Sequence, residues 1–147
     1  MAPLIVLAVS ALLFWLAGRA GVAAFRDLSF VLRAALGVMF LFTASAHWGK
    51  RRGDLIRMVP PALPRPDLLV TFTGILEILG AIGLFVPITA RAACIGLLFL
   101  LVALFPANIH AARKGLTIAG QRVPSLPVRA AIQIVFIATL IAAAYLG

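Results

Sequence analysis

Six polar or ionisable side chains lie within or at the edges of long apolar runs in this sequence of 147 residues. A charged or polar group in an apolar environment is costly unless it has a partner, a hydrogen bond or an altered protonation state, so such positions are candidates for function. The chemistry open to these groups is proton transfer, hydrogen bonding to a ligand, or pairing with one another. They are Arg33, His47, Glu77, Asn108, His110 and Gln133.

Glu77 is the clearest of these candidates, because it lies in the middle of an apolar run and shares a helical face with Gly80 and Ala81. Small residues on that face allow another helix to approach closely. Three roles are open for its carboxyl group: an ion pair with Arg33 that sets helix register, ligand contact or proton handling, and a lone hydrogen-bonded carboxylic acid. Arg33 lies about 7–8 Å and Glu77 about 13–14 Å inside the same predicted boundary, a difference that a guanidinium group can span.

The remaining polar candidates each have a structural interpretation beside a functional one. His47 and His110 lie near the ends of apolar runs, where they can serve as interfacial anchors. Two histidines without a nearby third ligand are a weak metal signal, and no metal site is predicted. Asn108 or a neighbouring polar group can bond the carbonyl that Pro106 would free in a helix, and Gln133 can form an interhelical hydrogen bond. If these groups face inward with the buried carboxyl group, they line a polar crevice open to the cytoplasm.

Composition indicates the environment of these residues. The chain is 64% hydrophobic and 12% charged, whereas soluble domains have about 45–50% apolar and about 25% charged residues. A soluble domain of this size could not bury so much apolar surface. Runs long enough to cross about 30 Å of hydrocarbon lie near 4–24, 28–48, 68–87, 92–112 and 127–146. The sequence therefore predicts an all-α polytopic membrane protein with one membrane domain over 1–147.

The distribution of basic residues predicts the topology. The formal net charge of +9 comes from basic stretches between the apolar runs, which argues against a nucleic-acid partner. With five spans, segments 49–67 and 113–126 lie on one side, and together with Arg129 just beyond the second segment they carry nine of the 13 Lys and Arg residues. The positive-inside rule places both segments and the N-terminus in the cytoplasm, with the C-terminus outside. The proline-rich stretch 59–66 is a stiff connector, either a plain link or a lid over a site.

Two segments resemble each other at a constant offset of 63 residues. Residues 41–47 read Leu-Phe-Thr-Ala-Ser-Ala-His, and residues 104–110 read Leu-Phe-Pro-Ala-Asn-Ile-His. A duplicated helical hairpin would produce such an echo, with a pseudo-two-fold axis along the membrane normal. His47 and His110 would then occupy equivalent positions at the cytoplasmic ends of two helices. Chance similarity between apolar helices is the alternative explanation.

The stretch from Arg33 to Gln133 resembles the DoxX family of small bacterial membrane proteins. The residues that carry this resemblance are Arg33, Gly37, Phe40 and His47, then the segment 73–84 with its Gly-Ile-Leu-Glu core, then the segment 104–110. The resemblance implies that the last four spans form a four-helix transmembrane bundle in a bacterial cytoplasmic (inner) membrane. The first span is then an extra N-terminal transmembrane helix.

The resemblance implies a quinone or redox setting, or a role in the assembly of partner proteins. The chain has a single cysteine, Cys94, and shows no phosphate loop, nucleophile triad or dinucleotide fingerprint. The sequence therefore favours a module that catalyses no reaction on its own. It would bind a lipophilic ligand, a quinone or a lipid, or a partner subunit, through the cytoplasm-facing polar crevice around Glu77. A membrane subunit of a quinone-linked oxidoreductase and a small transporter are the alternatives, and redox-complex subunits or a second copy of the chain are the implied partners.

Overall fold

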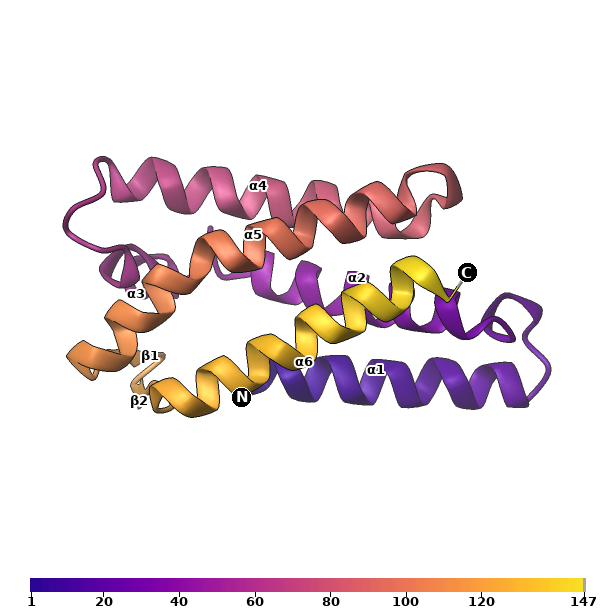
Figure 1. Ribbon diagram of the computed structural model, residues 1–147. Coiled ribbons are helices and arrows are strands. Elements are labelled where there is room, and N and C mark those ends of the chain that lie inside the picture. Colours follow the sequence, from indigo (N-terminus) through magenta and orange to yellow (C-terminus); the bar gives the residue numbers. More distant parts are fainter. Residues whose placement is uncertain (147) are drawn as a thin grey trace.

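The computed structural model describes residues 1–146, which form an all-helical fold with one short β-hairpin (Figure 1). Five helices are long and apolar enough to cross a membrane, as judged by length and composition. They are α1 (Ala2–Arg19), α2 (Leu28–Ser45), α4 (Pro66–Phe85), α5 (Pro87–Lys114) and α6 (Leu126–Tyr145). The shorter elements are η1 (Ala23–Phe25), α3 (Arg52–Met58), β1 (Thr117–Ile118) and β2 (Gln121–Arg122). The prediction of an all-α chain with five long apolar helices is confirmed.

Local sequence fixes where these helices begin and end. The Asp27 carboxylate caps α2, because it accepts hydrogen bonds from the backbone N–H groups of Ser29 and Phe30, both at 3.1 Å. Helices α1, α4, α5 and α6 each have proline in the first turn, where the missing N–H group costs nothing. Helix α5 ends at Lys114 and is followed by Gly115, which adopts a left-handed φ of 59° that glycine tolerates.

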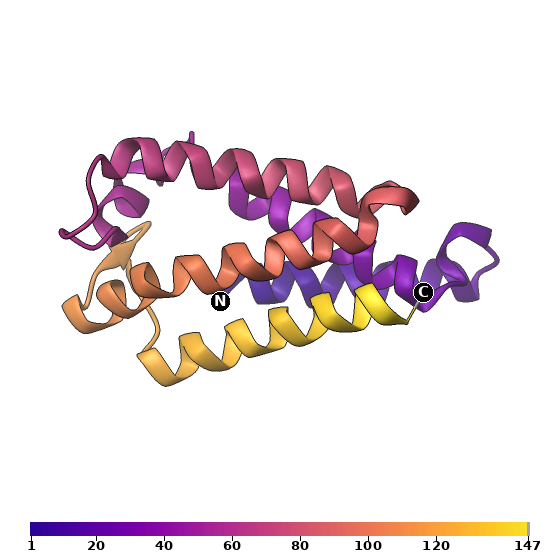
Figure 2. The ribbon, with the colours of Figure 1, turned by 45° about the horizontal axis from the view of Figure 1, so that its top comes forward.

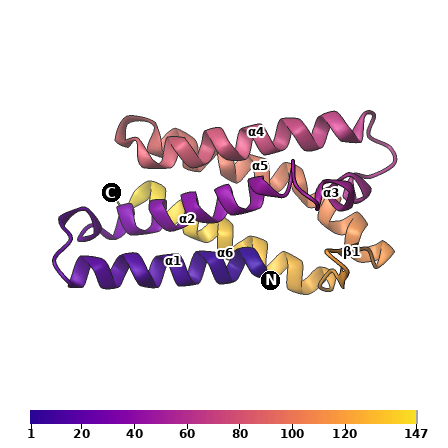
Figure 3. The same ribbon diagram turned by 180° about the vertical axis from the view of Figure 1, so that it is seen from behind.

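Four of the long helices contact one another in a closed ring (Figures 1 and 2). Helix α2 packs against α4, α4 against α5, α5 against α6, and α6 back against α2. Helix α1 packs along α2 outside this ring, as Figure 3 shows from behind. The centre of the ring is apolar, and its fully buried side chains include Leu36, Phe40, Leu84, Leu97 and Leu140. Helix α2 contacts three other long helices, so it is the element against which the candidate site is built.

One end of the ring carries a small cap, defined here as α3 together with the β1–β2 hairpin. Helix α3 contacts α4, α5 and β1, and it lies where α2 and α5 end and α4 and α6 begin (Figures 1 and 3). The Asp54 carboxylate accepts a hydrogen bond from the Ala119 N–H group at 2.9 Å and a second from Arg57. The Ala119 bond, followed by the charge of Arg57, lowers the pKa of Asp54 below its usual value. The segment 49–67 is therefore a helix followed by a proline-rich connector, tied to the hairpin.

Candidate functional site

His47 is buried against α4 because the chain turns immediately after α2 ends at Ser45. Its side chain folds back toward the ring, and the residue is 7% exposed. Its Nδ1 atom lies 2.7 Å from the carbonyl oxygen of Val70 on α4. Gly74 makes this approach feasible, since a Cβ atom there would lie only 2.7 Å from His47 Cγ and 2.8 Å from Trp48 Cη2.

Glu77 lies one turn further along α4, and it is 5% exposed. Its Oε1 atom is 3.5 Å from His47 Nε2, and its Oε2 atom accepts a hydrogen bond from Thr43 Oγ1 at 2.7 Å. Thr43 belongs to α2, so this polar triad of Thr43, His47 and Glu77 joins α2 to α4. The buried carboxyl group is therefore paired across a helix interface, which satisfies the requirement that buried polar groups have partners.

The geometry of the triad fixes the position of one hydrogen on His47. The Val70 carbonyl can only accept a hydrogen bond, so His47 Nδ1 carries a hydrogen and donates it. His47 Nε2 faces the Glu77 Oε1 atom at 3.5 Å, so a further proton placed between them can be carried by either group. The triad can thus store and exchange a proton. The side-chain nitrogen and oxygen atoms of Thr43, His47 and Glu77 all have contacts within the protein.

Arg52 fastens the turn that carries His47. Its Nη1 donates to the His47 carbonyl at 2.8 Å, while Nη2 donates to the Asp67 carbonyl at 3.0 Å and to Thr71 Oγ1 at 2.9 Å. One guanidinium group therefore links the first residue of α3 to the end of α2 and the start of α4. Sequence reasoning counted Arg52 only as a cytoplasmic charge. It also missed Thr43 and Gly74, because nothing in their spacing distinguishes them from other residues of apolar helices.

Arg33 does not pair with Glu77, so of the three roles left open for the Glu77 carboxyl group the ion pair with Arg33 is excluded. The Arg33 guanidinium lies 3.9 Å from the Asp27 carboxylate, and its Cζ atom lies 5.5 Å from the centroid of the Phe30 ring. Glu77 is level with Thr43, which is ten residues, or about 15 Å, from Arg33 along α2.

The reason for this separation is a stagger between α2 and α4. A Cβ atom at Gly37 would lie 2.6 Å from Phe85 Cε2, so the end of α4 is level with Gly37 rather than with the start of α2. Arg33 lies a full turn beyond that level. Depths measured from the ends of apolar runs assume that neighbouring helices end together, and these two do not.

A second polar cluster joins α5 to α6. Gln133 Nε2 donates to the Leu101 carbonyl at 3.0 Å, and Asn108 Nδ2 donates to Gln133 Oε1 at 3.3 Å. Arg129 also donates to Asn108 Oδ1. The interhelical hydrogen bond predicted for Gln133 is therefore present. Gln133 bonds the carbonyl of Leu101. Pro106 would free the carbonyl of the next residue, Val102.

The six predicted candidates therefore separate into groups, and they do not line a single crevice. Glu77 and His47 lie between α2 and α4, whereas Asn108 and Gln133 lie between α5 and α6. His110 is half-buried, and over residues 1–146 it makes no side-chain hydrogen bond. It also lies within α5, which continues to Lys114, whereas His47 follows the end of α2. The two histidines are thus not in equivalent positions.

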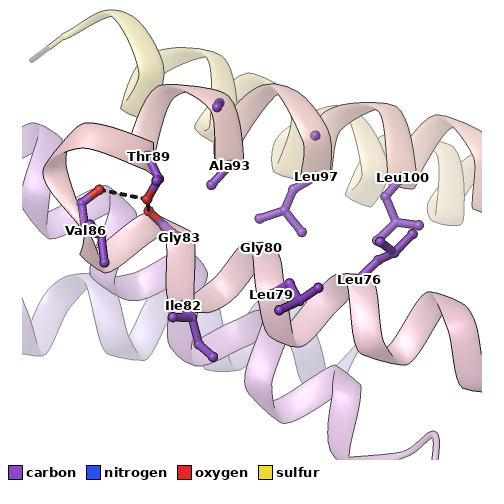
Figure 4. A pocket seen from close by; sticks show the side chains of 12 residues that line it. Leu76, Leu79, Gly80, Ile82, Gly83, Val86, Thr89, Ala93, Leu97 and Leu100 are labelled. Carbon is purple, nitrogen blue, oxygen red and sulfur yellow. Dashed lines mark hydrogen bonds between the residues drawn. The ribbon is translucent and has the colours of Figure 1, made fainter.

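An apolar groove of about 500 Å³ lies between α4 and α5 (Figure 4). Its floor forms because α4 has glycine where α5 comes close: a Cβ atom at Gly80 would lie 2.4 Å from Leu97 Cδ2, and one at Gly83 would lie 2.9 Å from Ala93 Cβ. Thr89 is the polar side chain in its lining, and the Thr89 hydroxyl bonds the carbonyls of Gly83 and Val86. The groove therefore presents no free polar side chain and suits an apolar occupant.

The fold and these sites define an all-helical protein with five long apolar helices, a buried polar triad and an open apolar groove. Residues 36–146 match a domain of unknown function, DUF8561, and the chain belongs to that family. No curated protein matches the chain. No solved structure matches it either. The family match begins within α2 and ends with α6, so it includes the triad, the second cluster and the groove, and it leaves out α1.

Proposed function

We propose that this chain is a DoxX-like multi-pass membrane protein that binds a lipophilic ligand, a quinone or a lipid, and catalyses no reaction on its own. Helices α2, α4, α5 and α6 are its four-helix transmembrane bundle, and α1 is an additional transmembrane helix. The protein resides in a bacterial inner membrane with the N-terminus in the cytoplasm and the C-terminus outside.

Two features support the membrane location. Large apolar side chains are exposed on the outer faces of all five long helices, and Phe99 and Ile134 are 67% and 65% exposed. Surfaces of this kind are stable in hydrocarbon and would aggregate in water. The cap end of the ring also carries both basic segments, 49–67 and 113–126, as the positive-inside rule requires of a cytoplasmic end.

The groove between α4 and α5 is the observation that carries the ligand-binding proposal. Its volume of about 500 Å³ lies within the range of small-molecule sites, which are mostly apolar and about 300–1,000 Å³. It opens on the outer face of the ring, so a molecule dissolved in the bilayer could enter it sideways. Leu76, which lines the groove, directly precedes Glu77. A ligand that shifts α4 would therefore act on the triad.

One observation favours the second candidate, a membrane subunit of a quinone-linked oxidoreductase. Reduction of a quinone consumes protons, and Glu77, which faces His47, belongs to α4, the helix that forms one wall of the groove. In that role the triad would be a proton store for a partner that carries the electrons.

Filling the groove tests the proposal. Ala92 lines the groove and is exposed, whereas Ala103 is exposed on the same helix outside the groove. Ala92→Leu should therefore reduce the amount of co-purified quinone or lipid by about tenfold, because a branched side chain would occupy ligand volume. Ala103→Leu should leave it unchanged. The measurement is native mass spectrometry of gently extracted protein. The same amount of bound quinone or lipid in wild type and both variants, or none in any of them, would contradict the proposal.

A further inference from the structure

A second hollow, of about 240 Å³, lies beside the turn that follows α2. It is separate from the groove between α4 and α5, and it lies at the cap end of the ring. The residues around it are Phe42, Ser45, Ala46, Gly49, Lys50 and Arg51.

The lining of this hollow has an apolar part and a cationic part. Phe42 and Ala46 provide the apolar part, and Lys50 and Arg51 provide two positive charges. Both basic side chains are exposed, and neither forms a salt bridge within residues 1–146. The neighbouring Arg52 is turned away, because its guanidinium group binds the His47 carbonyl and Thr71. The charge of Arg51 also acts on Asp54, but neither Lys50 nor Arg51 is held in a salt bridge, so both side chains can bind an anion.

We infer that this hollow binds one anionic phospholipid of the cytoplasmic leaflet, with its phosphate on Lys50 and Arg51 and its first methylene groups against Phe42. The inference rests on the membrane location proposed above. It is argued from charge complementarity: the hollow has two cations and no acidic residue in its lining. Basic pockets beside transmembrane helices on the cytoplasmic side are established sites for anionic headgroups. The depth order also fits, since the apolar wall lies in α2 and the cations follow its end.

The position of this hollow gives the lipid a structural consequence. Ser45, Ala46, Gly49 and Lys50 belong to the same turn as His47. One side of that turn places the imidazole against α4, and the other side borders the hollow. A lipid bound there would therefore brace the turn that holds the triad together.

Two matched charge variants separate this site from general attraction to a basic surface. Lys50→Gln with Arg51→Gln removes the pair at the hollow, whereas Arg113→Gln with Lys114→Gln removes an adjacent basic pair at the same end, at the close of α5. Both variants change the net charge equally. Purified protein is titrated with phosphatidylglycerol or phosphatidylcholine, and bound lipid is counted by native mass spectrometry.

The first phosphatidylglycerol should bind about tenfold or more weakly to the Lys50/Arg51 variant, and its affinity for the Arg113/Lys114 variant should stay near that of wild type. Ala46→Leu, which keeps both cations but narrows the hollow, should also weaken binding. Phosphatidylcholine binding should change little. Equal weakening in both charge variants, no weakening in either, or displacement of the lipid by millimolar inorganic phosphate would overturn the inference.

The measurements test the groove ligand and the phospholipid site independently. Ala92→Leu lies in the groove and should leave the phosphatidylglycerol site intact. An empty groove together with phosphatidylglycerol binding that depends on Lys50 and Arg51 would refute only the groove ligand. A ligand in the groove, together with phosphatidylglycerol binding that neither charge variant weakens, would refute only the phospholipid site.

Discussion

Replacing His47 by alanine should lower the free energy of unfolding by about 3–5 kcal/mol, the cost of removing one partner of a buried pair. The substitution leaves the Glu77 carboxyl group buried beside an empty space, with only the Thr43 hydroxyl still bonded to it. It also removes the shorter hydrogen bond to the Val70 carbonyl, which accepts from His47 Nδ1 at 2.7 Å and from Thr73 Oγ1 at 3.2 Å. Unfolding in mixed micelles by titration with a denaturing detergent, followed by circular dichroism, measures this difference.

The chain offers a matched control for this substitution. His110 is half-buried and makes no side-chain hydrogen bond within residues 1–146, so His110→Ala should change stability by less than about 1 kcal/mol. Adding Glu77→Leu to His47→Ala should recover much of the loss, since it removes the unpaired carboxyl group. Equal effects of the two histidine substitutions, or additive effects of His47→Ala and Glu77→Leu, would show that the triad is not a coupled unit.

Gly74→Ala should be the second most damaging change, with a cost of about 1–3 kcal/mol from overpacking. The added methyl carbon would lie 2.7 Å from His47 Cγ and 2.8 Å from Trp48 Cη2, closer than real side chains pack. His47 cannot simply move aside, because Val70 and Glu77 hold its ring from both nitrogens. The unfolding titration measures the loss. A shift in the fluorescence of Trp48, recorded in a Trp15→Phe background, would report the displacement directly.

Gly96→Ala is the control for backbone and propensity effects. Nothing lies within 4 Å of a Cβ atom at Gly96, and alanine is favoured over glycine in a helix by about 1 kcal/mol. The Gly96 variant should therefore be as stable as wild type or slightly more stable. Destabilisation of both glycine variants to the same extent would mean that close packing at His47 is not the cause.

The five long helices could be predicted from the sequence because apolar runs of that length are a strong signal. Their ends were less accurate: the run 92–112 became Pro87–Lys114, since Pro87 starts the helix and Pro106 is accommodated within it. Helix α3 and the hairpin were not predicted. They are too short to show periodicity, and contacts such as Asp54 with Ala119 form only in the folded chain.

Sequence reasoning identified two members of the triad, Glu77 and His47, but neither Thr43 nor the contact between them. Glu77 and His47 stand out because ionisable groups are rare in apolar runs, but their contact depends on a turn and on the stagger of α2 against α4. The groove left almost no signal, because it is formed by missing side chains at Gly80, Gly83 and Gly96. Small residues are as typical of close helix packing as they are of a groove. The structure shows where the packing ends and the groove begins.

The most direct test of the central claim is photo-crosslinking in intact membranes with a quinone analogue that carries a diazirine on its isoprenoid tail. Crosslinked peptides, mapped by mass spectrometry, should come mainly from residues 76–86, at the end of α4, and from residues 89–100 of α5, which form the groove. Ala92→Leu should reduce this labelling and Ala103→Leu should not. Labelling spread evenly over all five long helices, or concentrated on α1 and α6, would contradict a ligand site between α4 and α5.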